Sequence, residues 1–166
     1  HVDYNDGVVM PAAIDRRVQI LAAPSRDDYT HLYAYDLGKR LSFRHADIEA
    51  GRDAQGRKIP GWARYPAGIA WSLAKAGFEP SPIKAIYSST IPIGAGLSSS
   101  AAVEVGFAFL WNKIGGWGIE PLELARLSQQ AENGYVGLAS GLMDQFASAC
   151  GVEGHALVFD TRSLEW

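Results

Sequence analysis

The stretch at 91–103, which reads IPIGAGLSSSAAV, constrains the fold of this chain more than any other. Apolar and β-branched residues at 83–87 predict a strand before it, Pro92 and two glycines interrupt that strand, and apolar residues at helical spacing follow the serines. Glycines let a ligand approach the backbone closely, and the free N–H groups of a first helical turn attract anions. We therefore expect a strand, a tight loop that binds a phosphate chain, and a helix.

Other interpretations of this loop have different consequences. A Gly-rich turn can be a plain connector in which serine caps the next helix. The Walker phosphate loop is excluded because its lysine is missing. A dinucleotide-binding loop matches only in part, because Ser99 occupies the position of the third glycine and no second strand ending in an acidic residue follows. That alternative predicts bound NAD and a parallel sheet.

Three motifs together resemble one family. The loop from Pro92 to Ala101 looks like the ATP-binding loop of the GHMP kinases, which phosphorylate galactose, homoserine, mevalonate and related alcohols. The first seven residues, HVDYNDG, are similar to the end of the signature of the galactokinase branch, which reads H-x-D-Y-N. The segment 141–145, GLMDQ, resembles that branch's G-[IL]-M-D-Q, and Glu132 lies twelve residues before Asp144, as in the branch. The combination is specific, although the short third motif alone is not.

The resemblance implies an α+β fold, a two-layer sandwich like ribosomal protein S5 domain 2, which is the N-terminal domain of a GHMP kinase. We expect residues 1–166 to form this ATP- and sugar-binding domain, truncated at both ends relative to the family. The family has an Arg and a Glu near the sugar in a segment before this one, and a second α/β half after it. The length of 166 residues, 48% of them hydrophobic, is enough for one core.

The activity that the resemblance implies is ATP-dependent phosphorylation of D-galactose at the anomeric hydroxyl, which gives galactose 1-phosphate and ADP. Kinases of galacturonate or N-acetylgalactosamine share these motifs, so the sugar is open. A non-catalytic sensor that binds galactose and ATP without turnover is the alternative from a different class. The fragment itself is also expected to be inactive if it must complete its site with the missing half.

Site roles follow from the same resemblance. Asp144 would be catalytic, accepting the proton of the sugar hydroxyl or orienting it, and His1, Asp3, Gly141 and Asp144 would bind the sugar. Mg²⁺, a hard cation, would be held by Ser100 and Glu132. Glu104 is expected to face away from the phosphates. The ATP phosphates would be bound by Pro92, Gly94, Ala95, Gly96, Leu97, Ser98, Ser99 and Ser100.

The net charge and the number of cysteines indicate which classes of partner and which cellular compartment to expect. A formal net charge of −3 without a dominant Lys/Arg cluster argues against nucleic acid and anionic membranes as partners. The single cysteine, Cys150, excludes an internal disulfide and suits a reducing cytoplasm. No apolar run reaches membrane-spanning length. An apolar face that is exposed by separation from the second half could drive self-association.

The remaining chain predicts mixed secondary structure. Strands are expected near 8–13, 18–22, 31–35 and 41–43, joined as a meander or hairpins, with a last strand at 154–160. Helices are expected at 62–76, 99–114, 121–134 and 142–149.

Overall fold

A computed structural model of the chain describes residues 2–92 and 94–166. The helices in that part of the chain are α1 (Gly61–Lys75), α2 (Ser99–Gly115), α3 (Pro121–Gln130) and α4 (Met143–Cys150), with a π-helical segment, η3 (Ala131–Val136), after α3. Its strands are β1 (Val8–Val9), β2 (Val18–Pro24), β3 (Tyr29–Ala34), β4 (Lys39–Arg44), β5 (Ile83–Ser89) and β6 (Phe159–Asp160). Two short 3₁₀ turns, η1 (Tyr35–Leu37) and η2 (His45–Asp47), flank β4.

The main sheet of the described residues has the strand order β2-β5-β3-β4. β3 and β4 form the expected antiparallel hairpin, but β5 lies between β2 and β3, antiparallel to the former and parallel to the latter. The simple meander is therefore wrong. β5 takes an inner position because its alternate residues Ile83, Ala85 and Tyr87 are apolar and buried, whereas β2 is exposed at alternate positions along the sheet edge. The mixed sheet also contradicts the parallel sheet of a dinucleotide-binding fold.

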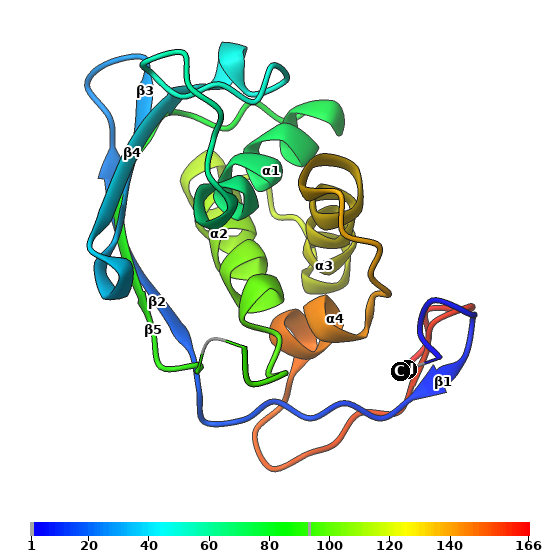
Figure 1. The fold of residues 1–166 in the computed structure, drawn as a ribbon. Helices are drawn as coiled ribbons and strands as arrows, with labels where there is room; N and C mark the ends of the chain where they lie inside the picture. Colours follow the sequence, from blue (N-terminus) through cyan, green and yellow to red (C-terminus); the bar gives the residue numbers. More distant parts are fainter. Residues whose placement is uncertain (1, 93) are drawn as a thin grey trace.

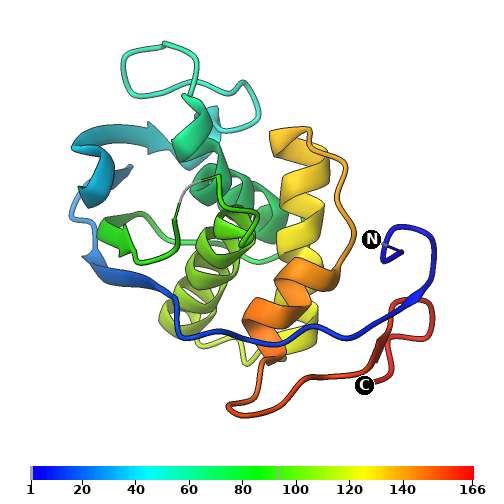
Figure 2. The ribbon, with the colours of Figure 1, turned by 60° about the horizontal axis from the view of Figure 1, so that its bottom comes forward.

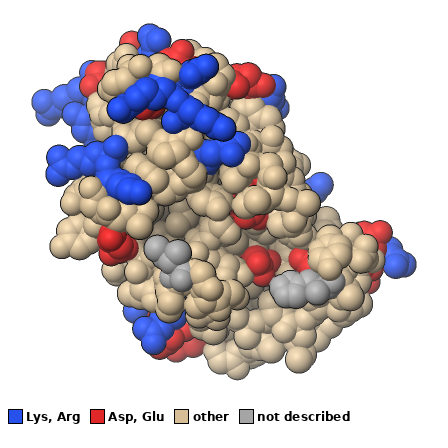
Figure 3. Space-filling model, in the orientation of Figure 1, with Lys and Arg blue, Asp and Glu red and all other residues tan. Residues whose placement is uncertain are grey.

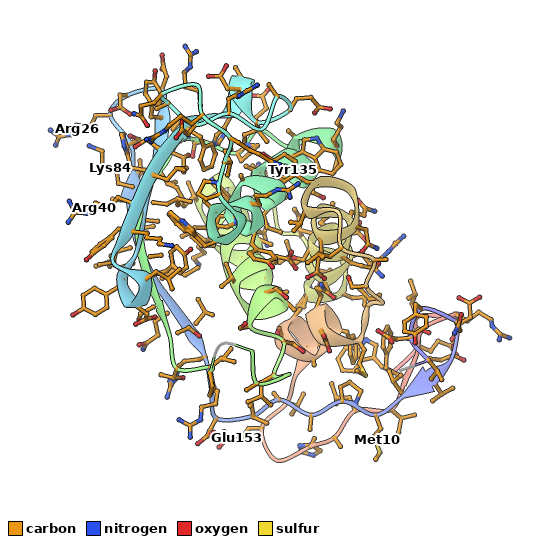
Figure 4. All side chains as sticks on the ribbon, viewed as in Figure 1. Met10, Arg26, Arg40, Lys84, Tyr135 and Glu153 are labelled. Carbon is orange, nitrogen blue, oxygen red and sulfur yellow. The ribbon has the colours of Figure 1, made fainter. Side chains whose placement is uncertain are left out.

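The helices lie on one side of this sheet, so the molecule has two layers (Figure 1). This confirms the expected α+β sandwich. The other face of the sheet carries no helix in the described residues, and Arg26, Arg40 and Lys84 point outward from that side (Figure 4). The helices thus bury one face of the sheet and leave on the second face a mixture of charged side chains and exposed apolar ones such as Leu21.

The core consists of two groups of buried side chains. The larger group lies between the sheet and the helices and includes Phe43, Leu73, Phe107 and Trp111, all fully buried. The smaller group joins α4 to the two ends of the chain, because the ring of Phe146 stacks on that of Phe159 with 3.8 Å between centroids. Figure 2 shows the two ends of the chain side by side next to α4. Segments from opposite ends of the sequence therefore share one small core.

The strands at the two ends are much shorter than expected. β1 and β6 pair over two residues each, Val8 with Asp160 and Val9 with Phe159. On one side of this pairing an isolated bridge joins Ala12 to Ala156, and on the other Thr161 donates hydrogen bonds to Gly7 O. Pro11 lies between these pairings and has no N–H to donate, although its carbonyl oxygen accepts a hydrogen bond from Leu157 N. The predicted strands at 8–13 and 154–160 are wrong in length for this reason.

Three helices begin and end within two residues of the expected bounds. The helix expected at 121–134 differs, because α3 ends at Gln130 and the chain continues as the π-helical segment η3 to Val136. Such wide turns occur frequently at functional sites. None of the helices in the described ranges is long and apolar enough to cross a bilayer.

Candidate active site

The loop between β5 and α2 has the conformation that its glycines permit. Gly94 and Gly96 have φ values of 75° and 69°, and a Cβ on either would meet no atom within 4 Å. These glycines are therefore required by the backbone conformation, which other residues rarely adopt. Ser98 precedes α2 with a φ of 53° and forms no side-chain hydrogen bond to cap the helix. The expected strand, loop and helix are confirmed, while phosphate binding by 92–100 stays a prediction.

The predicted base Asp144 and this loop line the same cavity. Its volume is about 590 Å³, and its walls include Gly96, Leu97 and Ser98 from the loop and Asp144 from the first turn of α4. Arg17, which precedes β2, lines the same cavity. Sequence reasoning missed Arg17, and its only signal was the pair of adjacent arginines at 16–17 before a strand. The cavity thus combines a carboxylate, the guanidinium groups of Arg16 and Arg17, and residues of the loop.

Asp3 comes from the other end of the sequence and reaches the chain just before α4. Its Oδ2 accepts a hydrogen bond from Met143 N at 3.3 Å. A Cβ on Gly141 would lie 1.9 Å from the same Oδ2. The Asp3 carboxylate therefore occupies the space beside Gly141, and sugar binding by these two residues stays a prediction. His1, the other residue expected near the sugar, lies outside the described residues.

Glu132 lies in η3 and is 5% exposed. Its Oε2 accepts hydrogen bonds from Ser140 Oγ at 2.6 Å and from Gln145 Nε2 at 2.8 Å. In the described part of the chain, no Lys, Arg or His side chain forms an ion pair with it. Two neutral donors thus hold a buried carboxylate that forms no ion pair with the residues at 2–92 and 94–166.

Glu104 is fully buried on α2, near Glu132. Burial first, and the charge of Glu132 second, raise the pKa of Glu104 to about 9. Its Oε2 lies 3.2 Å from Gln145 Nε2, which donates to it. The expectation that Glu104 faces away from the phosphates says nothing of this buried environment. The sequence did not predict that Glu104 is buried, because a single Glu on a helix is usually exposed to solvent.

Mg²⁺ takes oxygen ligands and usually combines one or two carboxylates with waters and substrate phosphates, so the hydroxyl of Ser100 and the carboxylate of Glu132 are ligands of a suitable kind. That the two bind one ion stays a prediction. A buried carboxylate without a positive neighbour also favours a cation. Among the described residues there is no cluster of three or more His, Cys, Asp or Glu that could hold a metal. The protein would therefore supply only part of the ligand shell, and phosphate oxygens and waters would supply the rest.

Charged side chains are unevenly distributed over the face of the molecule that Figure 3 shows. Figure 3 shows Lys and Arg gathered in the upper part of the view, over β3, β4 and the neighbouring loops. Acidic side chains are interspersed among them at the top, and others lie lower in the view, in the middle of this face and at its edges. This face therefore carries both signs of charge, with its basic side chains most numerous over β3, β4 and the neighbouring loops.

The comparisons with known proteins agree with these motifs. The family model described as GHMP kinases N terminal domain matches residues 64–152, and the galactokinase galactose-binding signature matches residues 1–24. A galactokinase of Streptomyces coelicolor is 46% identical over 99% of this chain, and one of Thermotoga maritima is 36% identical over 100% of it. The crystal structure of Lactococcus lactis galactokinase complexed with galactose superposes on 99% of the chain with a TM-score of 0.90 and 32% identity.

These matches cover only part of the relatives. The chain spans 41% of the Streptomyces protein, 44% of the Thermotoga protein and 42% of the Lactococcus chain. The N-terminal domain model, in contrast, matches more than half of the present chain. The chain therefore belongs to the GHMP kinase family.

Proposed function

We propose that the protein transfers the γ-phosphoryl group of ATP to the anomeric hydroxyl of D-galactose, giving galactose 1-phosphate and ADP. We further propose that residues 1–166 form its N-terminal, ATP- and sugar-binding domain. The main observation behind this proposal is that Asp144 and the loop between β5 and α2 line one cavity of about 590 Å³. The galactokinase relatives and the neighbour complexed with galactose support the choice of sugar.

In this proposal the chain contributes mainly position and charge. Phosphoryl transfer needs an in-line nucleophile and stabilised phosphate oxygens, with little covalent chemistry by the protein. Backbone N–H groups at 94–100 would bind the phosphates, and Asp144 would accept the proton of the sugar hydroxyl or orient it. Ser100 and Glu132 would hold Mg²⁺, which when bound neutralises charge on the phosphates. Asp3 would bind the sugar beside Gly141.

The test compares Asp144→Asn with the wild-type full-length protein in a coupled assay with galactose, ATP and Mg²⁺. We expect kcat to fall by about 10²- to 10⁴-fold, the usual contribution of a general base. The matched control is Glu123→Gln, which removes an exposed carboxylate from the first turn of α3, and it should retain full activity. Equal losses in both variants would contradict the assignment of Asp144.

The same assay decides between the alternatives. Turnover with galacturonate or N-acetylgalactosamine but not with galactose would show that the substrate is another sugar, while the reaction would still be phosphoryl transfer from ATP. Galactose binding measured by calorimetry without any turnover in the wild type would favour the sensor. A cytoplasmic location, suggested by the single cysteine, and self-association of the separated domain stay predictions.

A further inference from the structure

Gln145 is a polar residue of the GLMDQ segment to which neither phosphate nor sugar chemistry gives a role, yet it is fully buried. Its Nε2 donates to Glu132 Oε2 at 2.8 Å and to Glu104 Oε2 at 3.2 Å. One amide nitrogen, which carries two hydrogens, therefore joins two carboxyl groups from different elements. The contact connects α4, which carries Gln145, to η3 and α2.

This arrangement destabilises the fold, because it buries polar atoms that have no hydrogen-bond partner within residues 2–92 and 94–166. In the described residues, Glu104 Oε1 and Gln145 Oε1 are buried and have no hydrogen-bond partner. Leaving buried polar atoms without partners destabilises a fold by about 1–3 kcal/mol for each group. A leucine or methionine in place of Gln145 would avoid that cost, so a benefit of the amide elsewhere is to be expected.

The benefit is geometric. Both hydrogen bonds that the described side chains donate to the Glu132 carboxylate, from Gln145 and from Ser140, end on Oε2. They fix the rotation of the carboxylate and leave Oε1 for another ligand. Glu104 in turn accepts a hydrogen bond from the same amide nitrogen at 3.2 Å, which fixes the orientation of the Gln145 amide.

We propose that Gln145, held by Glu104, is a positioning residue that orients the Glu132 carboxylate for the cation of the bound nucleotide. The proposal rests on the function proposed above, because it takes Glu132 as a ligand of that cation. Outer hydrogen bonds of this kind orient metal ligands, and their loss typically weakens metal binding 10- to 100-fold. Gln145 also follows Asp144 directly in α4, so the same anchor fixes the turn that presents Asp144 to the cavity.

The test measures metal binding without turnover in the full-length protein. The probe is Mn²⁺ with a non-hydrolysable ATP analogue, followed by water-proton relaxation, and calorimetry with the analogue in EDTA reports nucleotide binding without metal. Gln145→Met keeps the size of the side chain and removes the amide. We expect it to raise the Kd for Mn²⁺ at least tenfold and to change the metal-free affinity for the analogue less than twofold.

Two further variants make the comparison specific. Glu104→Leu removes the acceptor that holds the Gln145 amide, and it should raise the Kd for Mn²⁺ in the same direction as Gln145→Met. Ser72→Ala is the matched structural control. It removes a buried hydroxyl of α1 that donates to Leu127 O of α3 at 2.8 Å and makes no contact with Gln145 in the hydrogen bonds of the described residues. Ser72→Ala should leave Mn²⁺ binding unchanged.

The outcomes separate the inference from the proposed function. If Glu132→Gln abolishes Mn²⁺ binding while Gln145→Met binds like the wild type, the positioning role is wrong and the proposed function stands. If the wild-type protein turns over but Glu132→Gln binds Mn²⁺ normally, Glu132 is no ligand and the inference is wrong with it. If the wild type neither turns over nor binds the Mn²⁺ complex, the proposed function itself is wrong.

Discussion

At Gly141 the absence of a single methyl group decides where the Asp3 carboxylate can lie. The site at which a Cβ would be built is only 1.9 Å from Asp3 Oδ2, far inside van der Waals contact. The same oxygen accepts a hydrogen bond from Met143 N. A substitution here would therefore displace Asp3 or the chain that leads into α4.

Gly141→Ala is expected to weaken galactose binding by about tenfold or more, because it displaces the carboxylate that we propose binds the sugar. Calorimetric titration of the full-length protein with galactose measures this. Gly61→Ala is the matched control, since a Cβ on Gly61 meets no atom within 4 Å and its φ is not positive. Galactose affinity unchanged by Gly141→Ala would argue that Asp3 does not need its present position.

At the scale of elements, the loop between β5 and α2 and the end of α2 use glycine for the same physical reason. Gly96 before the helix and Gly116 after it have φ values of 69° and 64°, and a Cβ on either would meet open space. Alanine at each position costs about 1 kcal/mol through the backbone alone. Only Gly96, however, lines the cavity that also contains Asp144.

This pair separates stability from binding. Gly96→Ala and Gly116→Ala should lower the free energy of unfolding by a similar amount, about 1 kcal/mol each. Only Gly96→Ala should also raise the Kd for ATP, because it changes the direction of backbone N–H groups in the loop. Urea unfolding and ATP titration of both variants check this, and equal ATP affinities in the two variants would contradict a phosphate-binding loop.

At the scale of the whole molecule, packing α2, η3 and α4 together buries two carboxyl groups in one small region. Glu104 is fully buried and Glu132 is 5% exposed. Burial then raises the pKa of Glu104 from 4.5 to about 9. Between these two values the unfolded chain binds fewer protons than the folded chain, so the stability that Glu104 contributes is complete below pH 4.5 and is lost as the pH rises toward 9.

We therefore expect the free energy of unfolding to fall between pH 7 and 8.5, with a slope of up to about 1.4 kcal/mol per pH unit from this group. His45, whose pKa is lowered by burial, acts in the opposite direction only at lower pH. Glu104→Gln should flatten the slope, whereas the exposed Glu123→Gln should keep the wild-type slope. Urea unfolding at several pH values measures the difference, and a wild-type slope in Glu104→Gln would mean that Glu104 titrates normally.

The sequence by itself determined the local features of this protein. The helices at 62–76, 99–114 and 142–149 and the strand, loop and helix around Gly96 could be predicted because spacing, glycine and proline act over a few residues. The expected positions of Asp144 and the loop depended on family motifs rather than on physics alone. Asp144 and the loop do lie along one cavity.

Only the tertiary structure decided the contacts between distant segments. It placed β5 between β2 and β3, brought Asp3 against Met143, and buried Glu104 with Gln145 and Glu132. Each of these contacts joins residues far apart in the sequence, so no local pattern records it. The physical reason for these contacts is the burial of apolar faces, which determines how the elements pack. The polar side chains that are buried between the elements then form hydrogen bonds with one another.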